Sequence, residues 1–480
     1  MQTRSKAAAI TAALLAAAGG SLAATTAKAS TDVTEFGISI GFTDYRLDWF
    51  NEVVDEFEAN HPEFDITVEG FGSYEDLLQS VTLAAQQGSP PAIAQYFEVA
   101  TQEARDAVTS EGEPLFASVE AAIDGRTEIL GEPVILGDVV SAVQDYYTLD
   151  GEFTSMPWNT SSTLLYANAS ILEAAGLLDV AGSVPAGSEP GGSGYAGESL
   201  PQTWEEIRAA CEAIMALDDA PEGCITWPNH GWFFEQSIGQ QGGLLANQEN
   251  GRAGRADEVF LDSPEMMAFV DYWAGLAESG DYIYSGNQRD WEFTQNALIS
   301  QNVAFILTSS GDGTALYESG QEAGFEVLAG RMPYNGEVDY AGNLIGGATL
   351  WLVNGLDDTV QDGALAFMQF LNNPENAADW HRISNYIPIT NAAVDLLEEE
   401  GWFEDRPYAR VATDQLALAD GSPAARGAIL GGFVQIRDVM TLAMEDVLVS
   451  GADPADRFAE AAEEAQTALD DYNALYAEEG

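Results

Sequence analysis

The sequence predicts an α/β protein built from two lobes, and three observations support this fold class. The chain has 480 residues, which is too many for one ordinary hydrophobic core and fits two lobes of common size. Hydrophobic residues make up 46% of the chain, enough to build such cores. Near the amino end, strand-like apolar runs alternate with helical stripes, which is typical of a parallel sheet covered by helices.

Three strands and two helices are predicted in order along the first hundred residues. The strands are short apolar runs between turn signals, at residues 36–42, 64–68 and 92–97. The helices between them carry apolar residues at helical spacing, namely Phe50, Val53, Val54 and Phe57 in one and Leu77, Leu78, Val81 and Ala85 in the other. Ligands bind beyond the carboxyl ends of parallel strands, so we expect Tyr74 and Glu98 near a binding crevice.

The later part of the chain predicts further helices and one long loop. Helical periodicity predicts helices over residues 204–217, 264–278, 360–371 and 454–476. The first of these begins with a capping box of Thr203 and Glu206. Residues 180–200 are rich in Gly, Pro and Ser and are predicted as a loop. Residues 192–197 formally match a dinucleotide-binding fingerprint, but they lack the strand and helix that it needs, so we reject that site.

The chain is strongly acidic, with 78 Asp and Glu residues against 17 Lys and Arg and a formal net charge of −61. Such a surface repels phosphate backbones and anionic lipid headgroups, which argues against nucleic-acid partners and peripheral membrane binding. In molar salt the Debye length falls to about 3 Å, and the self-repulsion becomes tolerable. We therefore predict a halophilic, salt-adapted protein; the alternative is an ordinary acidic secreted protein.

Residues 1–29 are predicted to be a secretory signal peptide. Two basic residues precede an apolar run over residues 7–18, and Ala27 and Ala29 are the small residues that a signal peptidase reads. The run is too short to cross a bilayer, and no later segment offers about eighteen uninterrupted apolar residues. No Cys lies near the cleavage site for lipid attachment, so we predict a periplasmic protein that begins near Ser30.

The two cysteines, Cys211 and Cys224, are close in sequence in a chain that we expect to be exported to an oxidising compartment. A disulfide between them would contribute about 3 kcal/mol by restricting the unfolded chain. The alternative is two buried thiols, because sequence spacing does not fix the Cα separation that a bridge requires.

The usual sequence signatures of catalysis and metal binding are not found. There is no HExxH motif, Walker A loop or GxSxG elbow, and His61, His230 and His381 are isolated from one another and from the cysteines. A glycosidase-like pair of carboxylates could be assembled in space, but nothing in the sequence selects one. We therefore predict no enzymatic activity, no cofactor and no metal site.

Several residues are suited to holding a small ligand, although each has a plainer explanation. Trp227 and Trp232 flank His230 and could stack on a carbon chain or a sugar, but aromatic residues commonly fill cores. Small residues at 309–311 and 346–347 could present hydroxyls and backbone amides to an anion, but turns explain them equally well.

Arg437 stands out because arginine is scarce in this chain and the residue lies in an otherwise apolar or acidic helical stretch. Its planar fork of donors suits phosphate or carboxylate. A salt bridge with one of the many acids explains Arg437 equally well at this point.

Several motifs form an ordered series along the chain. They include PWNTSSTLLY at residues 157–166, PENAADWH at residues 374–381, Gly346-Gly347, Tyr386 and the triplet Gln435-Ile436-Arg437. This series resembles the extracellular solute-binding proteins of ABC importers (family 1). It is most similar to the members of that family that bind sn-glycerol-3-phosphate, and the likeness covers nearly all of the chain after the signal peptide.

The resemblance implies a periplasmic-binding-protein fold (type II). In that fold two α/β lobes enclose a ligand cleft, and the chain crosses the hinge between them three times. The implied crossings lie near Trp158, Asn343 and Ala392. Lobe 1 would then consist of residues 30–157 and 344–391, and lobe 2 of residues 158–343 and 392–480.

The resemblance also implies a ligand site. The family's ligand contacts fall on Tyr74, Glu98, Ser161, Trp232, Ser309, Gly347, Tyr386 and Arg437, and Trp227 and Ser310 are further candidates. Glu98 would accept hydrogen bonds from glycerol hydroxyls, whereas Arg437 and the neighbouring hydroxyl and amide donors would hold a phosphate.

Two departures from the family pattern concern the ligand. The family's two pocket tryptophans come three residues apart, whereas here Trp232 matches one and Asn229 falls near the other. The family's early Trp-His pair is replaced by Gly41-Phe42. A more open or more polar wall leaves room for a glycerophosphodiester such as glycerophosphocholine, unless Trp227 fills the gap.

The expected function is capture of sn-glycerol-3-phosphate or a glycerophosphodiester in the periplasm, by a monomer that delivers it to the membrane permease of an ABC importer. One alternative is a sugar or oligosaccharide receptor of the same fold, which would not need Arg437. A less favoured alternative is a secreted hydrolase, which would consume its ligand.

Overall fold

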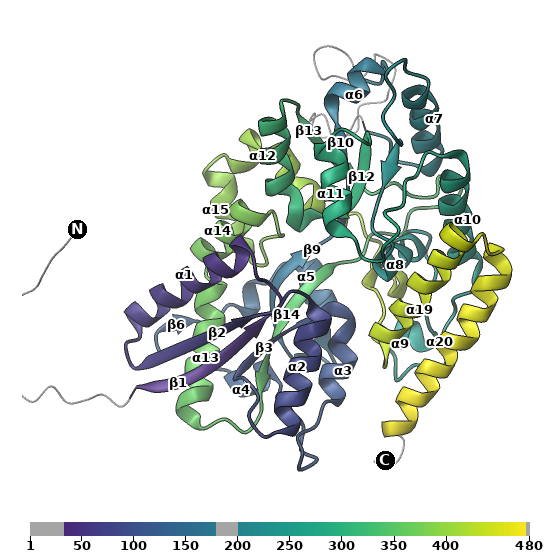
Figure 1. Ribbon diagram of the computed structural model, residues 1–480. Helices are drawn as coiled ribbons and strands as arrows, with labels where there is room; N and C mark the ends of the chain where they lie inside the picture. The colour runs from purple at the N-terminus through teal and green to yellow at the C-terminus, as the bar shows by residue number, and fades with distance from the viewer. Residues whose placement is uncertain (1–32, 179–199, 477–480) are drawn as a thin grey trace, which may run out of the picture.

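Two β-sheets, each covered by helices, form the two halves of the molecule in the computed structural model (Figure 1). The structure describes residues 33–178 and 200–476. The predicted signal peptide, the start of the mature chain at Ser30 and nearly all of the predicted loop over residues 180–200 lie outside the described residues. Within the described ranges, no helix has both the length and the apolar character needed to span a membrane.

The first sheet has six strands in the order β2-β1-β3-β14-β4, with β9 paired to the other end of β14. These strands are β1 (Thr34–Ile40), β2 (Phe64–Gly70), β3 (Ile93–Phe97), β4 (Phe116–Ala117), β9 (Met156–Ser161) and β14 (Gly346–Val353). The three strands predicted near the amino end are confirmed, and β1 runs parallel to β2 and β3. The sheet is mixed, however, because β14 runs antiparallel to β3 and to β9.

The second sheet has four strands in the order β11-β12-β10-β13. These are β10 (Thr163–Asn168), β11 (Ile225–Thr226), β12 (Phe305–Ser309) and β13 (Val327–Arg331). The central strand β10 runs antiparallel to both of its neighbours, β12 and β13. All four strands come from one continuous part of the chain, between β9 and β14.

The predicted helices are confirmed, and the four predicted over residues 204–217, 264–278, 360–371 and 454–476 begin and end within two residues of those bounds. They are α1 (Tyr45–Asn60), α2 (Tyr74–Gln86), α7 (Trp204–Met215), α10 (Pro264–Ser279), α13 (Asp358–Leu371) and α20 (Pro454–Tyr476). The apolar stripe of α1 is the face that it buries. The capping box at Thr203 and Glu206 opens α7, because each side chain accepts a hydrogen bond from the other residue's backbone amide.

Other helices complete the cover of the two sheets. The longer of them are α8 (Gly231–Gln240), α11 (Trp291–Ile299), α12 (Gly313–Ala323), α14 (Pro374–Ser384), α15 (Asn391–Glu399) and α19 (Phe433–Glu445). Shorter ones are α3 (Thr101–Asp106), α4 (Val119–Ile123), α5 (Ser141–Tyr147), α6 (Ala169–Ala174), α9 (Asn247–Gly251), α16 (Trp402–Asp405), α17 (Val411–Leu416) and α18 (Pro423–Arg426). Helices α19 and α20 pack against each other on the outer side of the second half (Figure 1).

The halves meet at a hinge where the chain changes sheets. Strand β9, which contains Trp158, pairs with β14 up to Ser161, so the chain passes to the second sheet at Ser162. The Ser162 hydroxyl donates a hydrogen bond to the carbonyl of Leu344 at 3.1 Å and accepts one from Gln415 Nε2 at 2.9 Å. The return to the first sheet lies between β13 and β14, and a further connection follows α14, where Ile387 pairs with Thr160.

Two large clusters of buried apolar side chains form the core, and each contains residues from both sheets. In one cluster Phe50 and Phe57 meet the ring of Phe367 edge to face. Burying each such ring contributes roughly 1.5–3 kcal/mol. In the second half, a disulfide joins Cys211 in α7 to Cys224 just before β11, with the Cα atoms 5.3 Å apart.

Candidate ligand-binding site

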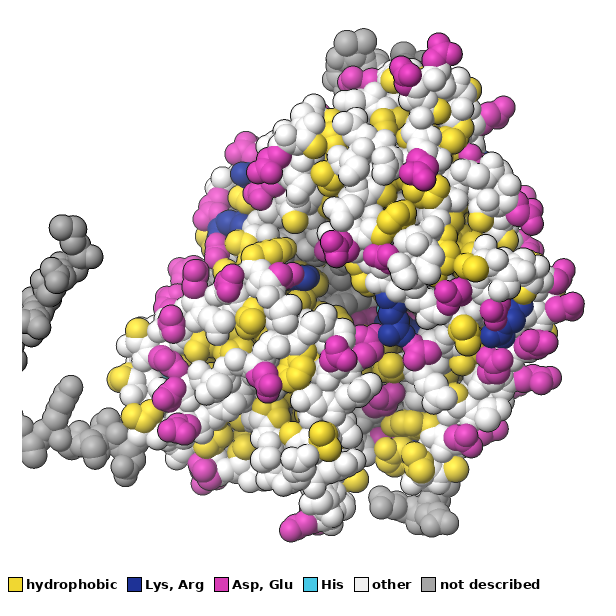
Figure 2. Space-filling model, in the orientation of Figure 1, with side chains coloured by type: hydrophobic (Ala, Val, Ile, Leu, Met, Phe, Trp, Pro, Cys, Tyr) yellow, Lys and Arg dark blue, Asp and Glu magenta, His cyan; other side chains and the backbone are white. Residues whose placement is uncertain are grey.

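A cavity of about 440 Å³ is lined by residues from both halves of the molecule. Figure 2 shows a hollow near the centre of one face, with Lys or Arg side chains at its edge, whereas Asp and Glu side chains are spread over the rest of that face. The cavity brings together all eight residues that the family pattern predicts, namely Tyr74, Glu98, Ser161, Trp232, Ser309, Gly347, Tyr386 and Arg437.

Most of these eight residues lie at or next to the ends of helices and strands, and Arg437 lies inside α19. Tyr74 begins α2, Glu98 follows β3, and Ser161 ends β9. Ser309 ends β12 and Trp232 lies in the first turn of α8. The arrangement agrees with the expectation that a ligand binds beyond the ends of the strands.

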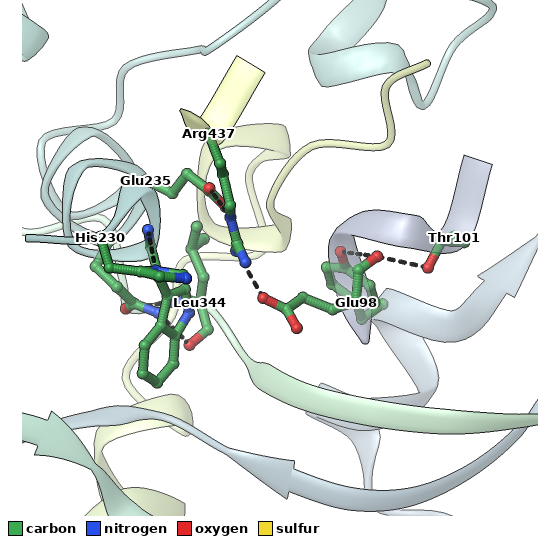
Figure 3. Close-up of polar contacts among 9 residues, drawn as sticks. Glu98, Thr101, His230, Glu235, Leu344 and Arg437 are labelled. Carbon is green, nitrogen blue, oxygen red and sulfur yellow. Dashed lines mark hydrogen bonds and ion pairs between the residues drawn. The ribbon is translucent and has the colours of Figure 1, made fainter. Parts of the chain in front are cut away.

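At one end of the cavity, Arg437 lies between two buried carboxylates (Figure 3). Its Nη2 donates to Glu98 Oε1 at 2.6 Å, and its Nε and Nη2 donate to the two oxygens of Glu235 at 2.5 and 3.0 Å. The three residues are 4%, 5% and 7% exposed. Burial lowers the pKa of Arg437, but Glu235 and Glu98 more than offset it and hold the pKa above the ordinary value.

This cluster, defined here as the arginine triad of Arg437, Glu98 and Glu235, carries one more negative than positive charge when all three are ionised. Its bonds use Nε and Nη2 of the guanidinium but not Nη1. Burial raises the pKa of Glu235, although Arg437 opposes that effect. Arg437 is thus both salt-bridged and part of the cavity wall. The sequence left open whether it binds an anion or forms a salt bridge, and the structure shows the salt bridge at a position that a ligand can reach.

Helix α8 approaches α19 closely because residue 231 is glycine. A Cβ at Gly231 would lie 2.6 Å from Cγ of Arg437. Beside it, burial and then the charges of Arg437 and Arg289 hold the pKa of His230 well below its usual range, so this ring is neutral. Trp232 is 5% exposed, and its Nε1 has no hydrogen-bond partner among the described residues. A ligand acceptor in the cavity would satisfy that donor.

A buried network of amides orients Tyr74 at the wall of the first half. Asn159 Nδ2 donates to the Tyr74 hydroxyl at 2.8 Å, and Gln95 Nε2 donates to Asn159 Oδ1 at 2.7 Å. Gln95 also accepts a hydrogen bond from the backbone amide of Gly41. The Tyr74 ring stacks on Phe97 at 5.3 Å, so the side chain is fixed at both its ring and its hydroxyl.

At the other end of the cavity, Tyr386 belongs to a stack of aromatic rings. It lies parallel to Trp380 at 5.4 Å, and Trp380 stacks on Trp158 at 5.1 Å. The imidazole Nδ1 of His381 lies 2.7 Å from the Tyr386 carbonyl and fixes the turn that follows α14. Nearby, Gly347 has φ +98°, and a Cβ there would lie 1.8 Å from the carbonyl oxygen of Asn159, so no larger residue fits.

The cavity also contains residues that the sequence did not single out. Arg46 lines it, is bound to Asp44 at 2.6 Å and stacks over the Phe42 ring at 4.3 Å. Arg289 lines it too, 3.2 Å from Glu75 and also paired with Asp438. Trp291, Gln295 and Asp312 also line the cavity. The scarcity of basic residues is the signal that could have pointed to both arginines.

Two further candidates lie outside the cavity lining. Trp227 is 1% exposed and packs in the core against Trp273 and Tyr282, so it does not fill the wall beside Trp232. Ser310 is fully buried, and its hydroxyl accepts a hydrogen bond from the backbone amide of Ser162. Asn229 is buried as well, since its side chain donates to the carbonyl of Thr441 at 2.8 Å. Family spacing could not reveal these inward orientations.

No cluster of three or more His, Cys, Asp or Glu side chains suited to a metal ion occurs in the part of the chain that the structure describes. The cavity instead combines hydroxyls, a backbone amide, aromatic rings and ion-paired arginines. This is a set that can hold a polar solute by hydrogen bonds and ring contacts.

Comparison with known proteins identifies relatives over most of the chain. The model of a family described as bacterial extracellular solute-binding protein matches residues 52–409. A curated relative, the sn-glycerol-3-phosphate-binding periplasmic protein of Yersinia pestis bv. Antiqua, is 28% identical over 411 residues. That match covers 84% of this chain and 85% of the relative.

Solved structures with the same fold cover nearly the whole chain. One is a glycerophosphocholine complex of a protein from Mycobacterium tuberculosis, with TM-score 0.68 and 18% identity over 91% of this chain and 98% of that one. Another is a cyclic α-maltosyl-1,6-maltose binding protein from Arthrobacter globiformis, with TM-score 0.67 and 19% identity over 91% and 99%. The predicted two-lobed periplasmic-binding-protein fold (type II) is thereby confirmed.

Proposed function

The chain belongs to the family of bacterial extracellular solute-binding proteins, and from this premise we propose that it captures sn-glycerol-3-phosphate or a glycerophosphodiester for an ABC importer. One observation carries the proposal. A single cavity is lined by all eight residues of the glycerol phosphate pattern, which come from segments far apart in the sequence. The name of the curated relative, an sn-glycerol-3-phosphate-binding periplasmic protein, supports the same ligand class.

In this proposal the end of the cavity with Tyr386 holds the phosphate. The hydroxyls of Ser161, Ser309 and Tyr386 and the backbone amide of Gly347 are donors for its oxygens. Nη1 of Arg437, like the Ser309 hydroxyl, adds a donor from the second half, and this one is charged. A ligand that contacts both halves favours the closed arrangement, because only a difference in affinity between open and closed states can shift that equilibrium.

The charges around the cavity favour a ligand without net negative charge. All three arginines that line it are held by carboxylates: Arg437 by Glu98 and Glu235, Arg289 by Glu75 and Asp438, and Arg46 by Asp44. A phosphate monoester brings about −1.5 to −2 charges at pH 7. A diester with a cationic headgroup, such as glycerophosphocholine, has no net charge. Since like charges repel strongly where water is excluded, we expect the diester to bind more tightly.

A sugar receptor of the same fold is the second candidate. The observation that favours it is the arginine triad, in which the guanidinium charge is already compensated by two carboxylates. Hydroxyl-rich ligands need no free cation, and the rings of Tyr74 and Trp232 offer faces for stacking on a sugar.

Calorimetric titration of the purified protein in molar salt separates these candidates. We expect glycerophosphocholine to bind, sn-glycerol-3-phosphate to bind more weakly, and maltose to give no heat of binding. Binding of maltose alone would overturn the glycerol phosphate proposal. Tighter binding of sn-glycerol-3-phosphate than of the diester would overturn only the charge argument.

We further propose that the protein acts in the periplasm as a monomer, delivers its ligand to membrane permease subunits and does not alter it chemically. The proposed lobes, divided near residues 158, 343 and 392, would close over the ligand. Recovery of unchanged ligand in full stoichiometry after long incubation tests the absence of catalysis. Light scattering at micromolar protein concentration tests whether the protein is a monomer.

We also propose adaptation to high salt, which the surface acids support (Figure 2). Screening by salt relieves repulsion among them. The midpoint of thermal unfolding should therefore rise between low and molar potassium chloride. A midpoint that falls over that range would contradict salt adaptation.

A further inference from the structure

A second cavity, of about 220 Å³, lies beside the hinge, and the residues that line it differ from those of the ligand cavity. Helix α5 of the first half forms one wall, and helices α17 and α18 of the second half form another. Asn343, Ile345 and Ile387 from the hinge segments complete it. We name it the hinge cavity.

The side chain of Arg426 lines the hinge cavity without a protein partner. Its Nε is buried and has no hydrogen bond. Among the arginines within residues 33–178 and 200–476, it is the one whose side chain makes no hydrogen bond, ion pair or ring contact. Arg426 as a whole is half-buried, but a buried N–H donor such as its Nε is costly unless something accepts its hydrogen bond. In a chain with 78 acidic residues, no carboxylate of the described residues takes that place.

A second guanidinium makes this corner more electropositive. Arg252 donates to the carbonyls of Arg426 and Gly427 at 2.6 and 2.7 Å, and it lies over the Tyr146 ring at 4.8 Å. Burial lowers the pKa of Arg252 to about 10, and the charge of Arg426 contributes in the same direction. Arg252 forms no ion pair with a carboxylate of the described residues. The carboxylate in the cavity lining, Asp145, is exposed, and its charge acts on the pKa of Arg252 in the direction opposite to that of Arg426.

The rest of the hinge cavity is mainly aliphatic. Val143, Ile345, Ile387, Leu416 and Ala425 are all buried and line it. An anion that fits must therefore have a small apolar body as well as a charged group, because inorganic anions would gain nothing from these walls.

We propose that the hinge cavity binds a small aliphatic carboxylate, whose oxygens accept hydrogen bonds from Arg426. Its position couples it to the ligand cavity. Tyr386 lines the ligand cavity and the next residue, Ile387, lines the hinge cavity, as alternate side chains of an extended segment do. An occupant of one cavity then changes the affinity of the other, and the effect is reciprocal.

Titration of the full protein with butanoate tests the site, with butan-1-ol as the neutral ligand of matched shape. Both are measured by calorimetry in a buffer low in chloride. We expect one butanoate site per chain and binding of the alcohol weaker by at least about tenfold, since a charged hydrogen bond is worth about 1.5–3 kcal/mol. Equal binding of the two would overturn the proposal.

Three variants make the assignment specific. Arg426→Gln should weaken the binding of butanoate at least about tenfold, because the charged hydrogen bond is lost. Ala417→Phe, at the exposed rim, should block the cavity without changing any charge. Arg105→Gln, which removes an exposed pair with Asp150, should bind as the wild type does. Unchanged butanoate binding by Arg426→Gln would overturn the site, and unchanged glycerophosphocholine affinity at saturating butanoate would overturn the coupling.

Discussion

The two ends of the ligand cavity are stabilised by different interactions. At one end, the arginine triad packs one guanidinium and two carboxyl groups in a region from which water is nearly excluded. At the other, Tyr386, Trp380 and Trp158 form a neutral stack with ring planes tilted by 11° and 29°. A buried charge is tolerated only while its partners are present, whereas each ring contributes through its own buried area. Substitutions should therefore act collectively at the charged end and separately at the aromatic end.

The largest effect is expected from Arg437→Ala, because it leaves Glu98 and Glu235 buried without a cation. Breaking a buried pair in this way costs about 3–5 kcal/mol. Denaturant unfolding measures the loss. The matched variant replaces all three residues with apolar ones, Arg437→Met, Glu98→Leu and Glu235→Met, and should recover most of the stability. A triple variant as unstable as the single one would show that the three charges do not act together.

The next largest effect is a pH dependence of stability, caused by a histidine beside the aromatic end of the cavity. Burial lowers the pKa of His381 to about 4 from a usual value of 6.5. As pH falls through 6.5, protons bind the unfolded chain but not the folded one, so stability declines until about pH 4 and then levels off. The loss attributable to this residue is about 3 kcal/mol. His381→Asn should reduce the pH dependence of the free energy of unfolding between pH 6.5 and 4. An unchanged slope would show that His381 is not the residue that causes it.

A smaller effect is expected from Tyr386→Phe, which keeps the ring stack and removes one hydroxyl. Stability should change by less than about 1 kcal/mol, whereas affinity for the proposed ligand should fall about tenfold, the worth of one hydrogen bond. Tyr408→Phe, a buried tyrosine whose ring stacks on Tyr317, is the control. If both variants bind as the wild type does, the Tyr386 hydroxyl does not contact the ligand.

The smallest effect is expected at the mouth of the cavity, from Arg289→Gln. The Arg289 and Glu75 side chains are 32% and 25% exposed, so their pair contributes less than about 1 kcal/mol to stability. The change should appear in the rate of ligand association at low salt and vanish in molar salt. Stopped-flow fluorescence of the cavity tryptophans measures it. A rate difference that persists in molar salt would place Arg289 in direct contact with ligand.

The sequence predicted what depends on local pattern. Apolar spacing was sufficient for α1, where the buried face is Phe50, Val53, Val54 and Phe57. The family resemblance supplied eight of the residues that line the cavity, because motif residues keep their order even when they are distant in the chain. Tyr74 and Glu98 could be anticipated from the alternation of strands and helices alone.

What the sequence could not predict depends on pairing across long separations. Nothing local indicates that Glu235, three residues after Trp232, meets Arg437 two hundred residues later. The antiparallel direction of β14 likewise depends on how the chain returns from the second sheet to the first. The apolar pattern of β14 itself does not distinguish a parallel from an antiparallel strand. The buried position of Trp227 could not be predicted for the same reason, since an aromatic side chain in a loop-like segment can turn inward.

The order of strands in the two sheets has a consequence for biogenesis. The second sheet is complete once the chain has been made as far as β13, whereas the first sheet still lacks β14 at that stage. A polypeptide emerging from its amino end would expose the edge of β3 throughout the synthesis of the intervening residues. Long-range pairing of this kind is slow to form and vulnerable to aggregation. Folding of the first half should thus be the late step, and it is the stage at which a chaperone or a mutation would decide the yield of active protein.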